Sequence, residues 1–401
     1  MWLIRGKHAF ELLVLIIKVG YSGKSKKNKD GNTCNRKPVR TVSNFFWRFG
    51  GNRRGTYGWL LGLHTKYCTL NKDKTTMQET VQKLLAPGKG LLAADESTKT
   101  ITKRFAALGL TSTPELNRKY REMLFSTTGI EEFLGGIIMF DETVRQSVEG
   151  KTFPQYLTGR GIIPGIKVDG GLEPFEGTEE QITKGLEGLG DKLKEYSGMG
   201  LDFTKWRAAF LITDIFPTDA LLNEDLGRMA EFARISQDVG FVPIVEPEVL
   251  LDGNHTTTRC EEVETKVLKL LFEKLKAKGA DLTQVILKIS MVVPGKESGV
   301  KAEPLEVANT TLRTLKNSVP PEVPGIVFLS GGQTPDEATN NLNEIVKLKA
   351  DSPWQLSFSY ARALQEEALS KWNGNNENIA KAQEIFYARA KKVSQARKGE
   401  L

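Results

Sequence analysis

Two apolar runs decide the fold: DFTKWRAAF at residues 202–210 and FVPIVEPEV at residues 241–249. Each run is short, rich in aromatic or β-branched residues and apolar enough for a strand that is buried on both faces. A stretch with helical spacing separates them. This order of strand, helix and strand is typical of a parallel sheet covered by helices, so we expect an α/β fold.

Six further runs of the same kind extend the pattern. They begin at Gly88, Gly135, Gly161, Val285, Gly325 and Gln355. Two intervening helices are marked by Thr113-Pro114 and Thr334-Pro335, which place a capping hydroxyl before a proline in the first turn. Eight such repeats predict a single closed (β/α)₈ TIM barrel. The first strand is not followed by the G-x-G-x-x-G of an open dinucleotide-binding sheet.

Charge divides the chain near Met77. Residues 1–76 contain 16 Lys and Arg against three acidic residues, whereas residues 77–401 contain 40 basic and 46 acidic residues. We expect residues 1–76 to be a basic N-terminal extension, which is a targeting segment or a wrongly assigned start, and residues 77–401 to be the barrel, opening with a helix at Met77. The acidic body argues against a nucleic-acid partner. No apolar run approaches the roughly 18 residues of a membrane-spanning helix.

Histidine and cysteine are scarce in the predicted barrel, which contains only His255 and Cys260. A zinc site requires several nitrogen or sulfur ligands. We therefore expect no metal and no other cofactor. The chemistry should come from carboxylates, amines and guanidinium groups.

Charged residues lie toward the carboxyl end of nearly every predicted strand, which is the active-site end of a barrel. They are Asp95, Asp141, Glu142, Lys167, Asp169, Lys205, Arg207, Glu246, Glu248, Lys288 and Arg362. Leaving one such group unpaired in a core costs several kcal/mol, so their repetition at one end indicates an active site rather than a structural ion network. Side chains two residues apart on a strand point to the same side, so we expect Lys205 and Arg207 to face the barrel mouth, together with Glu246 and Glu248.

Lys288 is the predicted nucleophile. It has apolar neighbours on both sides in VILKISMVV, residues 285–293. Desolvation and the positive charge of Lys205 would favour a neutral amine, which can form a Schiff base with a ketone. Glu246 and Glu248 can move the protons that this chemistry requires.

Two groups of residues predict phosphate binding. The turn Ser330-Gly331-Gly332 ends the seventh strand, where backbone N–H groups can bind an anion, and Arg362 ends the eighth strand within reach of the same anion. The second group comprises Ser97, Thr100, Arg104, Lys167 and Arg207. Two anion sites on either side of one lysine indicate a small substrate that is phosphorylated at both ends.

Seven motifs resemble those of class I fructose-bisphosphate aldolases. They are APGKGLLAADEST (86–98), PGIKVD (164–169), DFTKWR (202–207), VPIVEPE (242–248), LKISMVVPG (287–295), FLSGGQ (328–333) and FSYARALQ (358–365). The resemblance extends over residues 77–395. It implies a metal-independent, reversible cleavage of fructose 1,6-bisphosphate to dihydroxyacetone phosphate and glyceraldehyde 3-phosphate in glycolysis and gluconeogenesis, and a homotetramer. We expect a cytoplasmic enzyme, or a plastid or mitochondrial one if residues 1–76 are a targeting segment.

The resemblance also implies residue roles. Lys288 is similar to the Schiff-base lysine, Asp95 to the group that takes the proton of the substrate hydroxyl, and Glu246 to the acid/base. Lys205 and Glu248 would balance the charge around Glu246. Ser330, Gly331 and Arg362 would bind the phosphate of dihydroxyacetone phosphate, and Ser97, Thr100, Lys167 and Arg207 the other phosphate.

Two alternatives stay open. One is another Schiff-base barrel such as a transaldolase, which lacks these motifs. The other is a non-catalytic scaffold or cytoskeleton-binding role for an aldolase-like barrel.

Overall fold

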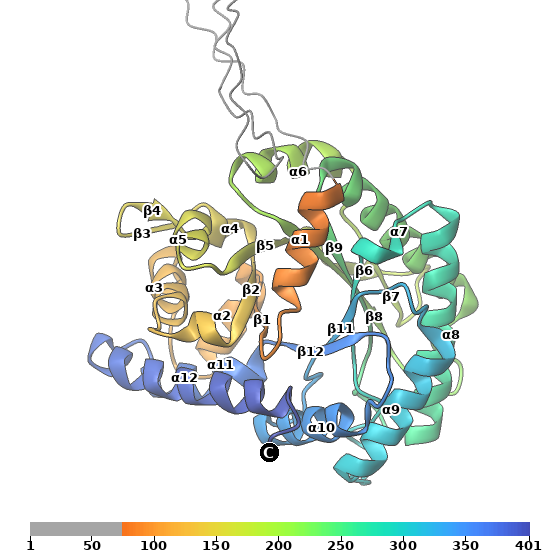
Figure 1. Cartoon of the computed structure of the whole chain (residues 1–401). Helices are drawn as coiled ribbons and strands as arrows, with labels where there is room; N and C mark the ends of the chain where they lie inside the picture. Colours follow the sequence, from red (N-terminus) through yellow and green to blue (C-terminus); the bar gives the residue numbers. More distant parts are fainter. Residues whose placement is uncertain (1–73) are drawn as a thin grey trace, which may run out of the picture. The chain divides into compact units, whose positions relative to one another are not determined.

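The computed structural model describes residues 74–401, so nearly all of the predicted N-terminal extension lies outside the described residues. Within them, eight parallel strands close into a barrel in the order β1-β12-β11-β10-β9-β8-β5-β2 (Figure 1). The strands are β1 (Gly90–Ala94), β2 (Leu134–Met139), β5 (Ile163–Lys167), β8 (Phe203–Phe210), β9 (Val242–Val249), β10 (Ile286–Ile289), β11 (Gly325–Phe328) and β12 (Gln355–Tyr360). Seven of them lie within a predicted run, and β2 begins one residue before the run that starts at Gly135. The predicted TIM barrel is therefore confirmed.

Helices follow the strands and surround the barrel (Figure 1). They are α2 (Thr98–Ala106), α3 (Pro114–Phe125), α4 (Asp141–Val144), α5 (Phe153–Gly159), α6 (Leu189–Gly198), α7 (Asp219–Val239), α8 (Thr257–Ala277), α9 (Pro304–Ser318), α10 (Pro335–Leu348), α11 (Arg362–Trp372) and α12 (Ile379–Ala396). Two hairpins were not predicted, β3 (Ser147–Val148) with β4 (Lys151–Thr152) and β6 (Leu172–Pro174) with β7 (Gln181–Thr183). Their strands have two or three residues, too few to show an alternating pattern.

The two predicted helix starts have the expected caps. Thr113 Oγ1 accepts a hydrogen bond of 3.1 Å from Leu116 N at the start of α3. At the start of α10, Thr334 Oγ1 accepts from Glu337 N at 3.2 Å, and the Glu337 carboxylate accepts from Thr334 N at 3.0 Å. This capping box satisfies two backbone N–H groups that a helix start would otherwise leave unpaired.

Alternate residues of each strand face opposite sides. Trp206, Ala208 and Phe210 of β8 belong to the large core between the strands and the helices. Phe203 faces the barrel interior, where its ring lies so close to Gly165 of β5 that a Cβ there would be 2.2 Å from a ring carbon. Lys205 and Arg207 follow Phe203 on the inner face because side chains alternate along a strand.

Helix α1 (Lys74–Leu84) closes the amino end of the barrel. It begins three residues before the predicted start at Met77. Its residues Met77, Val81 and Leu84, with Leu85, join an apolar cluster inside the barrel. The strands contribute Leu91, Ala93, Ile138, Ile163, Phe203, Val242, Ile244, Ile286 and Val327. The amino half of the barrel is thus a packed core rather than a pore.

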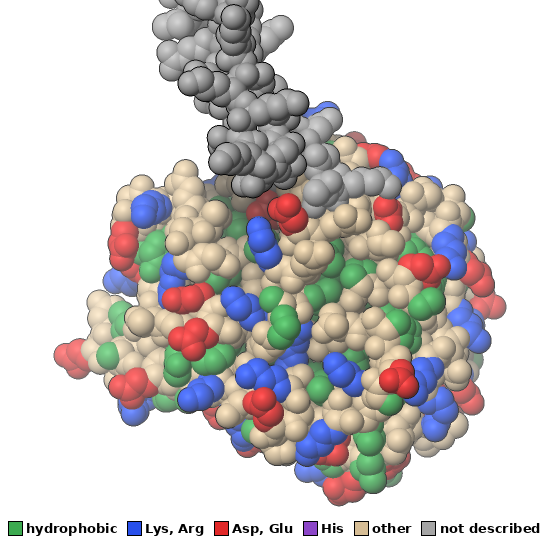
Figure 2. Space-filling model, viewed as in Figure 1, with side chains coloured by type: hydrophobic (Ala, Val, Ile, Leu, Met, Phe, Trp, Pro, Cys, Tyr) green, Lys and Arg blue, Asp and Glu red, His purple; other side chains and the backbone are tan. Residues whose placement is uncertain are grey.

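The face on which α1 lies carries both signs of charge. Figure 2 shows Lys and Arg interspersed with Asp and Glu, with apolar side chains between them. In the described part of the chain, none of the helices has the length and apolar character needed to cross a membrane.

Candidate active site

Four charged side chains from four strands meet inside the carboxyl end of the barrel. Lys205 Nζ on β8 lies 2.7 Å from Asp95 Oδ2, just after β1, and 2.8 Å from Glu246 Oε2 on β9. Lys288 Nζ on β10 lies 2.9 Å from the other oxygen, Glu246 Oε1. The side chains of Lys205, Glu246 and Lys288 are at most 5% exposed. We call these four residues the ion cluster.

The ion cluster keeps its carboxylates ionised. Burial alone would raise the pKa of Asp95 and of Glu246, but the charges of Lys205 and Lys288 lower both below their ordinary values. Burial would also lower the pKa of Lys205, yet Asp95 and Glu246 raise it above the ordinary value. Lys205 is therefore a permanent cation, held between two carboxylates. Lys288 contacts one carboxylate of the cluster, that of Glu246.

A second set of ion pairs lies beside the cluster. Arg207 pairs with Glu248 across β8 and β9, and Lys167 pairs with Asp169 after β5. Asp169 Oδ2 also accepts a hydrogen bond of 3.2 Å from Arg207 N. Glu248 was expected to balance charge around Glu246 together with Lys205, but its ion-pair partner is Arg207. Asp169 appeared in the strand pattern without a role, and its carboxylate contacts the Lys167 ammonium group and the backbone N–H of Arg207.

The glycine turn after β11 lies next to Arg362. Gly331 and Gly332 have φ angles of +58° and +103°, which residues other than glycine rarely adopt. Ser330 is buried. A Cβ built on Gly332 would lie 3.4 Å from Arg362 Nη2. Arg362 is the first residue of α11 rather than the end of β12. Gly332 of the turn therefore lies close to the Arg362 guanidinium group.

The second set of predicted phosphate-binding residues contains side chains in different environments. Ser97 caps α2, and its Oγ is 3.1 Å from Thr100 Oγ1, so the two hydroxyls share one helix start. Arg104 instead contacts Glu96, Gln365 and Glu366. Its guanidinium group is thus engaged with carboxylates of its own chain.

Two charged residues of the predicted pattern point elsewhere. Asp141 and Glu142 begin α4 rather than ending β2. Asp141 pairs with Arg145 and accepts from Tyr196 Oη, and Glu142 accepts from Asn117 Nδ2. The sequence pattern had joined the strand to the helix that follows it without a break.

Several buried side-chain atoms within residues 74–401 have no hydrogen-bond partner, and two of the groups concerned, Ser359 and Glu264, were given no role from the sequence. Ser359 Oγ on β12 is one, and its hydroxyl could bind a ligand at the barrel interior. Glu264 on α8 is the other; burial, aided by the charge of Glu248, raises its pKa well above the ordinary value. Burial at this position therefore favours the protonated form of the Glu264 carboxyl. No local signal marks either residue, because Ser is common in strands and Glu in helices.

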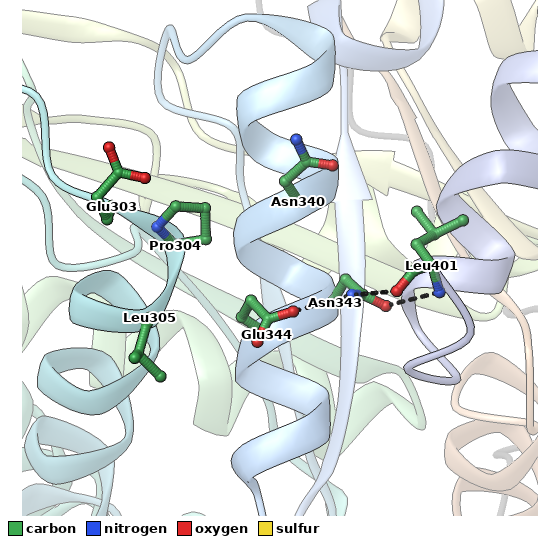
Figure 3. A pocket seen from close by; sticks show the side chains of 7 residues that line it. All are labelled: Glu303, Pro304, Leu305, Asn340, Asn343, Glu344 and Leu401. Carbon is green, nitrogen blue, oxygen red and sulfur yellow. Dashed lines mark hydrogen bonds between the residues drawn. The ribbon is translucent and has the colours of Figure 1, made fainter.

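A surface pocket of about 410 Å³ lies away from the ion cluster. Its lining includes the start of α9 at Glu303, Pro304 and Leu305, and α10 residues beside Leu401 (Figure 3). Asn343 exchanges two hydrogen bonds of 3.1 Å with the backbone of Leu401 (Figure 3). None of the predicted site residues lines it. Within residues 74–401, no three His, Cys, Asp or Glu side chains are placed to hold a metal ion.

Comparisons with known proteins identify the family of the chain. Residues 76–401 match the family model described as glycolytic fructose-bisphosphate aldolase class I. A probable fructose-bisphosphate aldolase class 1 of Xanthomonas axonopodis pv. citri is 46% identical over 318 residues, which cover 79% of this chain and 95% of the relative. The cytosolic fructose-bisphosphate aldolase 4 of Arabidopsis thaliana is 46% identical over 315 residues, covering 78% of this chain and 80% of that protein.

A solved structure gives the same result. The fructose-bisphosphate aldolase of Plasmodium falciparum, crystallised with TRAP and a small-molecule inhibitor, aligns with a TM-score of 0.80 and 43% identity, covering 84% of this chain and 99% of that chain. The predicted fold, enzyme class and reaction are confirmed, and nothing in these comparisons supports a non-catalytic scaffold. The chain belongs to the class I fructose-bisphosphate aldolase family.

Proposed function

We propose that the ion cluster is the catalytic centre for the family's reversible cleavage of fructose 1,6-bisphosphate, with Lys288 as the Schiff-base nucleophile. The observation that carries this assignment is the asymmetry between the two buried lysines. Lys205 contacts two carboxylates, whereas Lys288 contacts one oxygen of Glu246 at 2.9 Å. Nucleophilic attack requires a neutral amine, and Glu246 is the carboxylate placed to accept the proton that Lys288 must give up.

Lys288, Glu246 and Asp95 then act in turn. Lys288 Nζ attacks the C2 carbonyl of the ketose, and the resulting carbinolamine loses water as Glu246 returns a proton to the leaving hydroxyl. Asp95 accepts the proton of the C4 hydroxyl while the C3–C4 bond breaks, and the bond's electron pair moves into the iminium to give an enamine. Glyceraldehyde 3-phosphate leaves first. The proton that Asp95 took up returns to C3 of the enamine, and water then hydrolyses the resulting iminium to release dihydroxyacetone phosphate and the Lys288 amine.

Lys205 takes part as a fixed positive charge. It holds Asp95 and Glu246 in place and keeps both carboxylates ionised, so that each can act as a base. Glu248 supports the centre less directly, by orienting Arg207 through their ion pair. Its role is therefore to position a phosphate ligand rather than to move a proton.

Two phosphate sites flank the centre in this proposal. Ser330, Gly331, Gly332 and Arg362 bind the phosphate next to the ketone. Ser97, Thr100, Lys167 and Arg207 bind the phosphate at the aldehyde end, and Arg104 holds Glu96 at the start of that loop. Support comes from their placement. The first set follows β11 and β12, and in the second set Ser97 and Thr100 follow β1, Lys167 is the last residue of β5 and Arg207 lies within β8.

A trapping experiment tests the nucleophile. Dihydroxyacetone phosphate and borohydride are added to the full chain in excess EDTA, and the added mass is located by peptide mapping. We expect one secondary amine, on Lys288 alone. A label on Lys205 or Lys167, or trapping that requires added zinc, would contradict the proposal.

We also propose an oligomeric state and a cellular location. The resemblance supports a homotetramer, which light scattering on the purified chain would test. The cytosolic plant relatives support a cytoplasmic location, with a plastid or mitochondrion as the alternative if residues 1–76 direct import. Mass spectrometry of the mature N-terminus separates the two locations.

A further inference from the structure

Lys296 lies in the loop after β10, in a backbone position that three hydrogen bonds fix. Gly295 N donates to His255 O at 2.8 Å, Lys296 N to Leu251 O at 2.9 Å and Glu297 N to Gly253 O at 2.9 Å. The two loops are so close that a Cβ on Gly295 would lie 2.2 Å from Gly253 O. The loops after β9 and β10 therefore form one rigid support, and Lys296 projects from it.

The side chain of Lys296 reaches the glycine turn of the phosphate site. A Cβ built on Gly332 would lie 2.4 Å from Lys296 Nζ and 2.7 Å from Lys296 Cε. The same point is 3.4 Å from Arg362 Nη2. An ammonium and a guanidinium group thus flank one turn, and only a residue without a side chain leaves room for both.

The present partner of Lys296 holds it weakly. Lys296 Nζ lies 3.3 Å from Asp252 Oδ1, and the two side chains are 42% and 63% exposed. An ion pair this exposed contributes roughly 0–1 kcal/mol, so an anion in the turn can replace Asp252 at little cost. Two cations side by side also repel each other until an anion lies between them.

The charge of the ligand fits this arrangement. A phosphate monoester carries about −1.5 to −2 charges near neutral pH, which one arginine cannot neutralise. We infer that Lys296 is a second cationic ligand for the phosphate next to the substrate ketone, acting with Arg362 and the Ser330–Gly332 turn, and that Asp252 holds the lysine when the site is empty. This inference rests on the proposed function and extends it to a residue outside the predicted site.

Binding measurements without turnover test it. Calorimetry on the full chain would use inorganic phosphate, dihydroxyacetone phosphate and glyceraldehyde 3-phosphate as probes. For Lys296→Met we expect the affinity for the first two to fall about tenfold, as for loss of one charge-assisted hydrogen bond. The affinity for glyceraldehyde 3-phosphate, whose phosphate belongs to the other site, should not change. In the cleavage reaction KM should rise while kcat stays within about twofold.

Three further variants serve as controls. Lys296→Arg should keep most of the affinity. Lys301→Met removes a lysine of the same loop that is 76% exposed and pairs with Glu337 on α10, so it should bind like wild type. Asp252→Asn removes the competing carboxylate and should tighten phosphate binding about two- to threefold.

Several results would overturn the inference. Unchanged affinity for inorganic phosphate in Lys296→Met is one, and if that variant does not fold, unchanged affinity in Asp252→Asn is another. A loss for inorganic phosphate without a loss for dihydroxyacetone phosphate would assign the lysine to a free-anion site instead of the substrate. Each leaves the proposed function intact, which fails separately if the wild type neither cleaves fructose 1,6-bisphosphate nor traps on Lys288.

Discussion

The two ends of the same eight strands have opposite chemistry. At the amino end, Phe203, Val242, Ile244 and Ile286 fill the interior under α1. Two residues further along the inner face, the strands carry Lys205, Glu246 and Lys288. One end excludes charge and the other concentrates it. The difference separates the residues that hold the barrel together from those that act on a substrate.

The two ends of the barrel also differ in the free-energy cost of burying their side chains. The apolar end is stabilised by burial, at about 25 cal/mol per Å² of apolar surface. The charged end is costly to bury, and it tolerates the charges only because each has a partner. Substitutions at the charged end should therefore change catalysis or pH dependence, and substitutions at the apolar end should change stability alone.

The largest effect is expected for Lys288→Met. The variant keeps Glu246 paired with Lys205, so it should fold, but it cannot form a Schiff base. We expect turnover to fall at least about a thousandfold, or roughly 4 kcal/mol of barrier, with no borohydride trapping. Steady-state kinetics measure the loss, and Lys301→Met provides the matched surface control. Turnover above about a thousandth of wild type would mean that Lys288 is not the nucleophile.

The next effect is expected for Lys205→Met, which leaves Asp95 and Glu246 in the barrel without their shared cation. Breaking a buried pair costs about 3–5 kcal/mol, so the free energy of unfolding should fall by that order at pH 7. In wild type the lowered pKa values of both carboxylates stabilise the fold above their unfolded pKa values of about 4. That stabilisation is lost as the pH falls through the folded pKa values.

In the variant the carboxylates take up protons at a higher pH than in wild type. The difference between variant and wild type should therefore shrink as the pH falls from 7 toward 4. Urea unfolding at several pH values measures it. Lys266→Met, which breaks an exposed pair with Asp219 at 2.5 Å, is the control and should cost no more than about 0.5 kcal/mol. A loss that does not vary with pH would contradict the assigned charge pairing.

The sequence alone predicted much of this contrast, because the alternation of side chains along each strand shows which residues face the barrel interior. The eight strands, Lys205 and Glu246 on inner faces, and the glycine turn near Arg362 all come from local patterns. The choice of ion-pair partner does not come from a local pattern. Arg207 is opposite Glu246 in the strand register, yet its side chain pairs with Glu248. That preference depends on barrel tilt and side-chain length, which spacing along one strand does not encode.

The other contacts that the sequence did not predict involve loops. Lys296 approaches Gly332 only because the loops after β9 and β10 are hydrogen-bonded together, and a sequence pattern gives no path for either. Asp141 was read as part of a strand because α4 starts only two residues after β2 ends. Partners that lie far apart in sequence and belong to irregular segments were therefore beyond prediction.

At the apolar end, Leu84→Ala should cost stability without changing the chemistry. Leu84 is fully buried, and a Cβ on Gly136 would lie 2.5 Å from its Cδ2. Truncating such a leucine costs about 2–5 kcal/mol, and no titratable group is involved, so the loss should be the same at pH 5 and pH 8. Urea unfolding measures it, with kcat expected within about twofold of wild type. Gln78→Ala on the exposed side of α1 is the control. A large fall in kcat in folded Leu84→Ala would show that the two ends are coupled.

The smallest effect is expected from deleting residues 1–73, which keeps α1 complete. The apolar end already contains its own cover in Met77, Val81, Leu84 and Leu85, and the sequence before Lys74 has no periodic apolar face that would add to it. We expect the shortened chain to match the full chain in kcat and in the urea midpoint. Deleting residues 1–84 is the contrasting variant, because it removes α1 and exposes the interior cluster, so that chain should aggregate or fail to fold. If deletion of residues 1–73 alone lowers the unfolding midpoint, the extension stabilises the barrel, and the boundary between extension and catalytic body must be moved toward the N-terminus.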